Sequence, residues 1–147
     1  AEALDASDVS PYAMNLRAST ARHRDYAQAE EDQARQRWAW REFFERYDVL
    51  VTPVTSTVAF PHDHSEPVAA RTLTVNGEVT PYFSQLFWAG LAVGGHLPAT
   101  AMPVGLSADG LPVGMQIVGG AYRDRTTIWL AGLLEKLLGG FRPPPGY

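Results

Sequence analysis

The chain has 147 residues, of which 46% are hydrophobic and 19% are charged, with a net charge of −4 and no cysteine. These values favour one globular domain with a buried core, exclude disulfides and thiolate zinc sites, and permit a reducing compartment. A nucleic-acid partner is not expected, because the arginines between Arg17 and Arg46 alternate with Glu and Asp and leave no uncompensated positive surface.

Two helices are predicted in the first third of the chain. Ser10 followed by Pro11 is typical of a cap and a first helical turn, and this short helix should end near Ala18. Residues 20–47 are rich in Ala, Arg, Gln and Glu without Gly or Pro, which favours a long helix. Its second half carries an aromatic stripe that should pack on a core, formed by Trp40, Phe43, Phe44 and Tyr47.

A strand, a loop and a ribbon are predicted next. The apolar run 49–51 shows no alternation of faces, which predicts a buried strand in the centre of a sheet. Residues 53–67 contain three prolines and no periodicity, so they should form an irregular loop on the surface or beside a cleft. Asn76-Gly77 supplies a two-residue hairpin turn within residues 71–79.

The second half of the chain shows two helical segments separated by two strands. A helix is predicted from residue 81 to a stop at Gly94-Gly95, and another from Asp124 or Arg125 to Leu138. Residues 99–106 and 112–118 should pair as antiparallel strands across a short turn. The expected apolar faces comprise Tyr82, Leu86, Phe87 and Gly90 in the first helix, and Ile128, Leu130, Ala131, Leu134 and Leu137 in the second.

Three segments lie in a specific order and spacing. Residues 48–53 read DVLVTP, residues 97–105 read LPATAMPVG, and residues 109–119 read DGLPVGMQIVG. Together they resemble the C-terminal third of the amidase signature family. The resemblance spans residues 24–147, after a helical lead-in at 1–23, and the chain is treated as a single unit. It implies an α/β fold in which helices cover a mixed β-sheet that includes an antiparallel hairpin.

The resemblance also implies a chemistry, the hydrolysis of carboxamides without a metal or another cofactor. The family uses a Ser nucleophile, a second Ser in a cis peptide within a Gly/Ser-rich loop, and a Lys that acts as base through that second Ser. An amide carbonyl is a poor electrophile, so the nucleophile must lose its proton during attack and backbone N–H groups must meet the oxyanion.

That catalytic unit is not found in this sequence. The one lysine, Lys136, precedes the Gly139-Gly140 stop, a position typical of a cation at a helix C-terminus. None of the seven serines lies in a Gly-Ser-Ser-Gly-Gly-like loop or a Gly-x-Ser-x-Gly elbow. We therefore expect no catalytic residue here: the triad should lie on an upstream part of the enzyme, and this chain alone should hydrolyse no amide.

Five residues are candidates for substrate binding. The segment 82–92 resembles the channel-lining helix of fatty-amide-cleaving relatives, so Phe83, Phe87 and Trp88 are expected to face substrate, with ordinary core packing as the open alternative. Thr55 and Ser56 follow the C-terminal end of a strand, where ligands often gather. Aliphatic, aromatic, peptide C-terminal and fatty amides all remain compatible with these residues.

The histidines invite two further interpretations. His62 and His64 are two apart in an extended segment, but no third ligand is evident, so no metal site is expected. His96 stands where many family members place Gly, and a core histidine is favoured over a catalytic one.

The sequence also supports expectations about partners and cellular location. No run approaches the ~18 apolar residues of a membrane helix, and no signal peptide is seen, so a cytoplasmic protein without a membrane partner is expected. Because Ala1 replaces an initiator Met, we expect a processed or truncated product that pairs with the upstream part of the enzyme. Exposed strand edges should drive self-association. A non-catalytic module that binds a ligand or partner on the same scaffold is the alternative.

Overall fold

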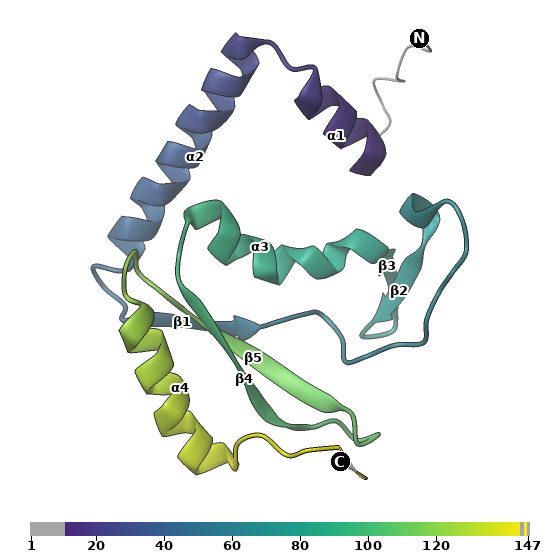
Figure 1. The fold of residues 1–147 in the computed structure, drawn as a ribbon, viewed down its shortest axis with the longest axis vertical. Helices are drawn as coiled ribbons and strands as arrows, with labels where there is room; N and C mark the ends of the chain where they lie inside the picture. Colours follow the sequence, from purple (N-terminus) through teal and green to yellow (C-terminus); the bar gives the residue numbers. More distant parts are fainter. Residues whose placement is uncertain (1–10, 145, 147) are drawn as a thin grey trace.

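The structure is a computed structural model that describes residues 11–144 and 146 (Figure 1). Its elements are α1 (Pro11–Ser19), α2 (His23–Phe43), β1 (Val49–Pro53), η1 (Val68–Ala70), β2 (Thr72–Val75), β3 (Glu78–Pro81), η2 (Tyr82–Gln85), α3 (Leu86–Gly95), β4 (Ala99–Leu106), β5 (Pro112–Gly119) and α4 (Asp124–Leu138). No described helix is both long enough and apolar enough to cross a membrane. The predicted cap at Ser10 lies outside the described residues.

The main sheet has three strands in the order β1-β5-β4, and both pairings are antiparallel. Because β5 lies in the middle, its Ile117 and Val118 are fully buried and form the centre of the core. Helix α4 packs against β4 and β5, and α2 contacts α3. The expected α/β class, with helices covering a sheet that contains an antiparallel hairpin, is confirmed. The expected mixed sheet is not seen, because all the described strand pairs are antiparallel.

The prediction that residues 49–51 form the central strand is wrong. Strand β1 is an edge strand of the described sheet, because β5 alone pairs with it. Val51 is 49% exposed, whereas its neighbour Thr52 is buried. A continuous apolar run therefore does not establish burial on both faces, since about half of Val51 stays accessible among the described residues.

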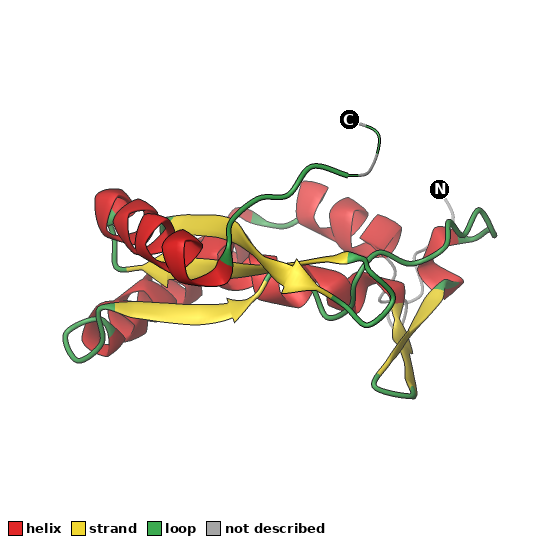
Figure 2. Ribbon diagram, turned by 90° about the horizontal axis from the view of Figure 1, so that it is seen from below, coloured by secondary structure: helices red, strands yellow, loops and turns green. Residues whose placement is uncertain are grey.

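The two predicted hairpins are confirmed. Strands β4 and β5 pair from Ala99↔Val118 to Leu106↔Pro112, with an irregularity between Pro103 and Gly105. Strands β2 and β3 pair across Asn76 and Gly77, whose φ angles of 53° and 86° are those that a two-residue hairpin turn requires. This small ribbon projects from the body of the molecule (Figure 2). The loop that precedes it contains only the short helix η1.

Helix α2 is shorter than predicted at both ends. The backbone of Arg22 is extended, and the Thr20 hydroxyl donates to the Leu16 carbonyl at 2.8 Å, so Thr20 belongs to the end of α1. At its other end the helix stops at Phe43, yet the aromatic stripe continues, since the rings of Phe43 and Tyr47 lie 4.7 Å apart. No residue of α2 is buried, so the aromatic end rests on the protein surface without entering the core.

Helix α3 begins at Leu86, after one 3-10 turn formed by η2, instead of at residue 81. The predicted apolar face is wrong in part, because Leu86 and Phe87 are 63% and 61% exposed. The buried positions are instead Ala92 and Gly95. A side chain at Gly95 would meet the Trp40 ring at 2.8 Å, so the small residue allows α3 to approach α2 closely.

Helix α4 has the predicted bounds and ends at Gly139 in the left-handed conformation. Its apolar face is also only partly correct: Leu130, Ala131 and Leu134 are half-buried, but Ile128 and Leu137 are 61% and 80% exposed. The fully buried side chain of this helix is Thr127, which a hydrophobic pattern does not identify.

Candidate functional site

Two of the five predicted substrate-binding residues line one cavity of about 320 Å³. Thr55 comes from the loop after β1, and Phe83 comes from η2, 28 residues later in the chain. The walls are mostly apolar, and the remaining lining residues are Thr57, Val58, Ala59, Phe60, Tyr82, Gln85 and Leu86. The volume and the apolar wall suit a small organic group.

The backbone of Ser56 contacts Gln85, one of the residues that line this cavity. Its N–H donates to Gln85 Oε1 at 3.1 Å, which fastens the loop after β1 to η2. Nε2 of the same Gln85 side chain is buried and has no hydrogen-bond partner among the described residues. Since a backbone N–H must meet an acceptor, the Ser56 contact defines which end of the amide is oxygen.

Phe87 and Trp88 do not line the cavity. Their rings contact each other edge to face, with centroids 5.1 Å apart, and Phe87 is exposed. The carbonyl of Trp88 accepts a hydrogen bond from Nε2 of the buried Gln116 at 2.7 Å, which ties α3 to β5. Phe87 and Trp88 are thus separated from Phe83, although all three were expected to face substrate, and Phe83 shares a cavity with Thr55 instead.

The Ser and Lys side chains that the expected amide hydrolysis needs are not brought together among the described residues. Lys136 is exposed near the end of α4, and no hydrogen bond joins it to any serine within residues 11–144 and 146. Ser84 and Ser107 are half-buried, and the Ser107 hydroxyl accepts a hydrogen bond from the Leu111 N–H within the β4–β5 turn.

The His62-Asp63-His64 segment is irregular, as predicted for this loop. The two imidazole rings lie 5.9 Å apart, and Asp63 accepts a hydrogen bond from the Ser65 N–H at 2.8 Å. Hydrogen bonds from the side chain and the backbone of Ser65 lower the pKa of Asp63. In the part of the chain that the structure describes, no group of three metal-binding side chains is present.

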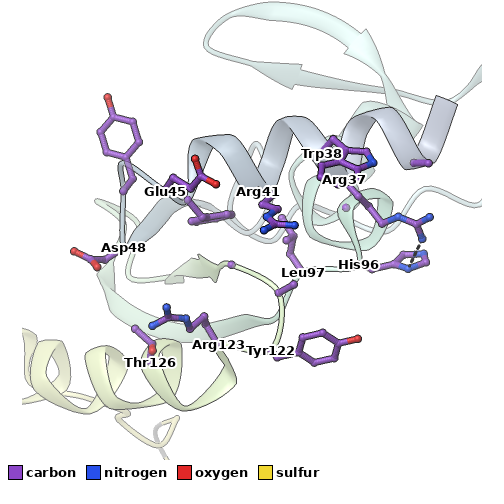
Figure 3. Close-up of a pocket in the computed structure, with 16 residues that line it drawn as sticks. Arg37, Trp38, Arg41, Glu45, Asp48, His96, Leu97, Tyr122, Arg123 and Thr126 are labelled. Carbon is purple, nitrogen blue, oxygen red and sulfur yellow. Dashed lines mark hydrogen bonds between the residues drawn. The ribbon is translucent and has the colours of Figure 1, made fainter. Parts of the chain in front are cut away.

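A larger cavity of about 940 Å³ lies between α2, the end of α3 and the turn before α4 (Figure 3). Sequence reasoning did not identify it, because its residues come from three separate segments and form no motif. Its lining residues are Ala34, Arg37, Trp38, Arg41, Phe44, Glu45, Tyr47, Asp48, Gly95, His96, Leu97, Gly120, Ala121, Tyr122, Arg123 and Thr126.

The side chains of α2 on this cavity are held by neighbours. Arg37 Nη1 lies 3.4 Å from His96 Nδ1, and the guanidinium of Arg41 lies over the Trp38 ring at 5.5 Å from its centroid. His96 is exposed, so the expectation of a core histidine is wrong. It caps α3 in the left-handed conformation, with φ 53°, a conformation that glycine adopts without steric cost.

A profile of the family described as Amidase matches residues 8–128. The chain belongs to the amidase family. The family is the one that residues 24–147 resemble, and the matched region contains β1, the β4–β5 hairpin and the start of α4.

Two curated relatives illustrate the range of this family. The chain is 36% identical over 104 residues to a glutamyl-tRNA(Gln) amidotransferase subunit of Rhodospirillum rubrum, covering 71% of this chain and 19% of that protein. It is 31% identical over 121 residues to a fatty acid amide hydrolase of Medicago truncatula, covering 82% of this chain and 19% of that protein. The chain therefore spans about a fifth of the length of these relatives.

The fold is shared with solved amidases. A bacterial aryl acylamidase of the amidase signature family superposes with a TM-score of 0.64 at 21% sequence identity, over 88% of this chain and 26% of that chain. The structure of 6-aminohexanoate cyclic dimer hydrolase gives a TM-score of 0.60 at 23% identity, over 92% of this chain and 29% of that chain. At this level of identity the likeness establishes the fold.

Proposed function

We propose that this chain is the C-terminal part of an amide hydrolase, and that it supplies scaffold and one wall of the substrate channel. The family match over residues 8–128 carries this proposal. The relatives are named for reactions on amides, and they extend well beyond the matched region.

The bond-breaking groups belong to polypeptide upstream of this region. A Ser nucleophile, a second Ser in a cis peptide and a Lys base would act there, and this chain would position the substrate against them. The exposed Lys136 and the absence of any Lys–Ser hydrogen bond within the described residues support this division of labour. Alone, the chain would hydrolyse no amide, because it has no activated nucleophile.

The wall that this chain contributes is the cavity of Thr55 and Phe83. It lies beyond the C-terminal end of β1, and its apolar surface would hold the acyl or amine portion of a substrate. Phe83 is half-buried, and its ring centroid lies 5.5 Å from that of Tyr82. The neighbouring ring therefore helps to fix the orientation of Phe83. Trp88 would contribute by holding α3 on β5 through its backbone carbonyl, and Phe87 contacts the Trp88 ring.

The experiment compares this chain with the longer polypeptide that contains it, on a panel of aliphatic, aromatic, peptide C-terminal and fatty amides. We expect turnover only by the longer protein, abolished by replacing its upstream nucleophilic Ser. In the longer protein, Phe83→Ala should raise KM by roughly tenfold with a smaller change in kcat, since it removes apolar contact common to ground and transition states.

Leu137→Ala is the matched control, because Leu137 is 80% exposed on α4 and lines neither cavity. Amide turnover by the purified short chain that disappears on mutating one of its own residues would refute the proposal. Equal kinetics for Phe83→Ala and the unmodified longer protein would remove Phe83 from the substrate wall.

A further inference from the structure

Helix α3 carries no polar side chain. Its ten residues read LFWAGLAVGG, and it runs between the β2–β3 ribbon and α2 (Figure 1). A helix that is apolar on all sides is normally buried on all sides, either in the core of a larger protein or in a membrane. Only Ala92 and Gly95 of this helix are buried in the described part of the chain. Most of its apolar surface therefore has no cover there.

One face of α3 is covered by contacts within this chain. Trp88, Leu91, Ala92 and Gly95 recur at the spacing i, i+3, i+4 and i+7, and all four are half-buried or buried. The Trp88 carbonyl accepts its hydrogen bond from β5, and the close approach at Gly95 is to α2. This face of the helix thus packs on the sheet and on α2.

The opposite face of α3 repeats the same spacing but is open to solvent. It consists of Leu86, Ala89, Gly90 and Val93, which we call the outer face of α3. All four residues are exposed, and the exposed fractions of Leu86 and Val93 are 63% and 74%. Two apolar faces on one helix, with cover for only one of them, indicate that a second apolar surface belongs against α3.

Gly90 supports this interpretation. Glycine inside a helix costs roughly 1 kcal/mol relative to alanine, so it usually has a reason in packing. Gly95 has such a reason in its close approach to Trp40, but a carbon added at Gly90 would meet no described atom within 4 Å. Within the described residues nothing requires a glycine at position 90, whereas the close approach of another backbone would require it.

A polypeptide fits the outer face better than a membrane does. No described helix can cross a membrane, and a helix that lies on a membrane surface carries charged residues, of which α3 has none. The chain spans about a fifth of the length of its curated relatives. Most of the polypeptide of such an enzyme therefore lies outside this region and must pack on some part of it.

We infer that the outer face of α3 is the surface on which the upstream part of the same enzyme packs. The inference rests on the proposed function only in taking this chain as part of a longer enzyme. Leu86 belongs to the outer face and also lines the cavity of Thr55 and Phe83. Polypeptide docked on α3 would thus lie directly beside the proposed substrate wall.

Thiol labelling tests whether this face is covered in the longer polypeptide. The chain has no cysteine, so Val93→Cys places a single thiol of this region on the outer face. In the isolated chain a maleimide should modify it readily. In the longer polypeptide the reaction should be roughly tenfold slower or more, because a covered thiol reacts only through local opening. Peptide mass spectrometry separates this thiol from any upstream cysteine.

Ala29→Cys is the matched control for labelling. Ala29 is exposed on α2, and Asp25 and Asp32, four residues before and three residues after it, are exposed on the same side of that helix. Its thiol should react at the same rate in the isolated chain and in the longer polypeptide.

Gly90→Leu gives a second readout, with opposite signs in the two proteins. In the isolated chain the leucine has open space and a better helix propensity, so the melting temperature should stay the same or rise. In the longer polypeptide the side chain would overlap the docked segment, and the melting temperature should fall. Ala29→Leu, the control, should change little in either protein.

Equal labelling of Val93→Cys in both proteins, or tolerance of Gly90→Leu in both, would overturn the inference. Protection in the isolated chain that grows with its concentration would assign the outer face to a second copy. Protection by phosphatidylcholine vesicles would assign it to a membrane, and either result would also overturn the inference. Neither measurement uses amide turnover, so a failure here is distinct from a failure of the proposed hydrolase function.

Discussion

The hydroxyl of Thr100 donates to the hydroxyl of Thr127 at 2.8 Å, and this hydrogen bond joins β4 to α4. Thr127 is only 1% exposed and donates in turn to the Asp124 carbonyl at 2.9 Å. The Asp124-Arg125-Thr126-Thr127 sequence at the start of α4 therefore has a structural role: a buried hydroxyl secures the first turn of the helix on the sheet.

Replacing Thr127 with Val should destabilise the chain by about 1–3 kcal/mol, because it keeps the shape of the side chain but leaves the Thr100 hydroxyl without its acceptor. Urea unfolding followed by circular dichroism measures this change. Thr72→Val is the control, since Thr72 is exposed on β2. Equal stabilities for both variants would contradict the role of the buried hydroxyl pair.

Gly119→Ala should be destabilising by about 1–3 kcal/mol, because the added carbon would lie 2.8 Å from Cγ2 of Thr127 and push α4 off β5. Gly132→Ala in α4 meets open space and should instead stabilise the chain by up to ~1 kcal/mol. Thermal unfolding of the two variants side by side measures the contrast. If both shifted the melting temperature in the same direction, close packing at Gly119 would not be the cause.

His96→Gly should leave stability unchanged or raise it, because relief of the left-handed strain at φ 53° offsets the lost contacts with Gln33 and Arg37. His96→Ala loses the same contacts and keeps the strain. The alanine variant should therefore be less stable than the glycine variant by about 1 kcal/mol. Denaturant midpoints measured on both variants give this difference in stability. An alanine variant more stable than the glycine variant would contradict the prediction.

The titration of Asp63 should be shifted to low pH, since the side chain and backbone of Ser65 hydrogen-bond its carboxylate and lower its pKa from 3.8. A group with a depressed pKa contributes stability above its unfolded pKa and loses that contribution as the pH falls through the folded value. Because Asp63 is fully exposed, the effect on unfolding should be small. Carboxyl NMR of Ser65→Ala should show an upward shift of the Asp63 midpoint; an unmoved midpoint would exclude the Ser65 hydroxyl as a cause.

We also predict that the isolated chain self-associates. Strand β1 is an edge of the described sheet with Val51 exposed, and α4 exposes Ile128 and Trp129. Val51→Lys should shift the population toward monomer, because a charged side chain on an edge strand opposes pairing with a second copy. Light scattering at tens of micromolar measures this, and a monodisperse monomer before mutation would contradict the prediction.

Local patterns predicted most of the elements. The Asn76-Gly77 turn, the β4–β5 hairpin and the bounds of α4 follow from turn chemistry and helical stop signals, which depend on neighbouring residues alone. The order and spacing of the segments around Pro53, Pro98 and Gly114 also led to the family that the profile match assigns. Burial was less predictable: Val51, Phe87 and Ile128 are apolar and exposed.

The sequence by itself determined the secondary structure, the family and the absence of a recognisable nucleophile–base motif, because these depend on short segments and their spacing. Only the tertiary structure decided that β1 is an edge, that Phe83 meets Thr55 while Phe87 does not, and that Arg41 and Arg123 share a cavity with Trp38 and Tyr122. The physical reason is that exposure and proximity arise when distant segments pack, and a periodic pattern shows which side of an element is apolar but not what will cover it.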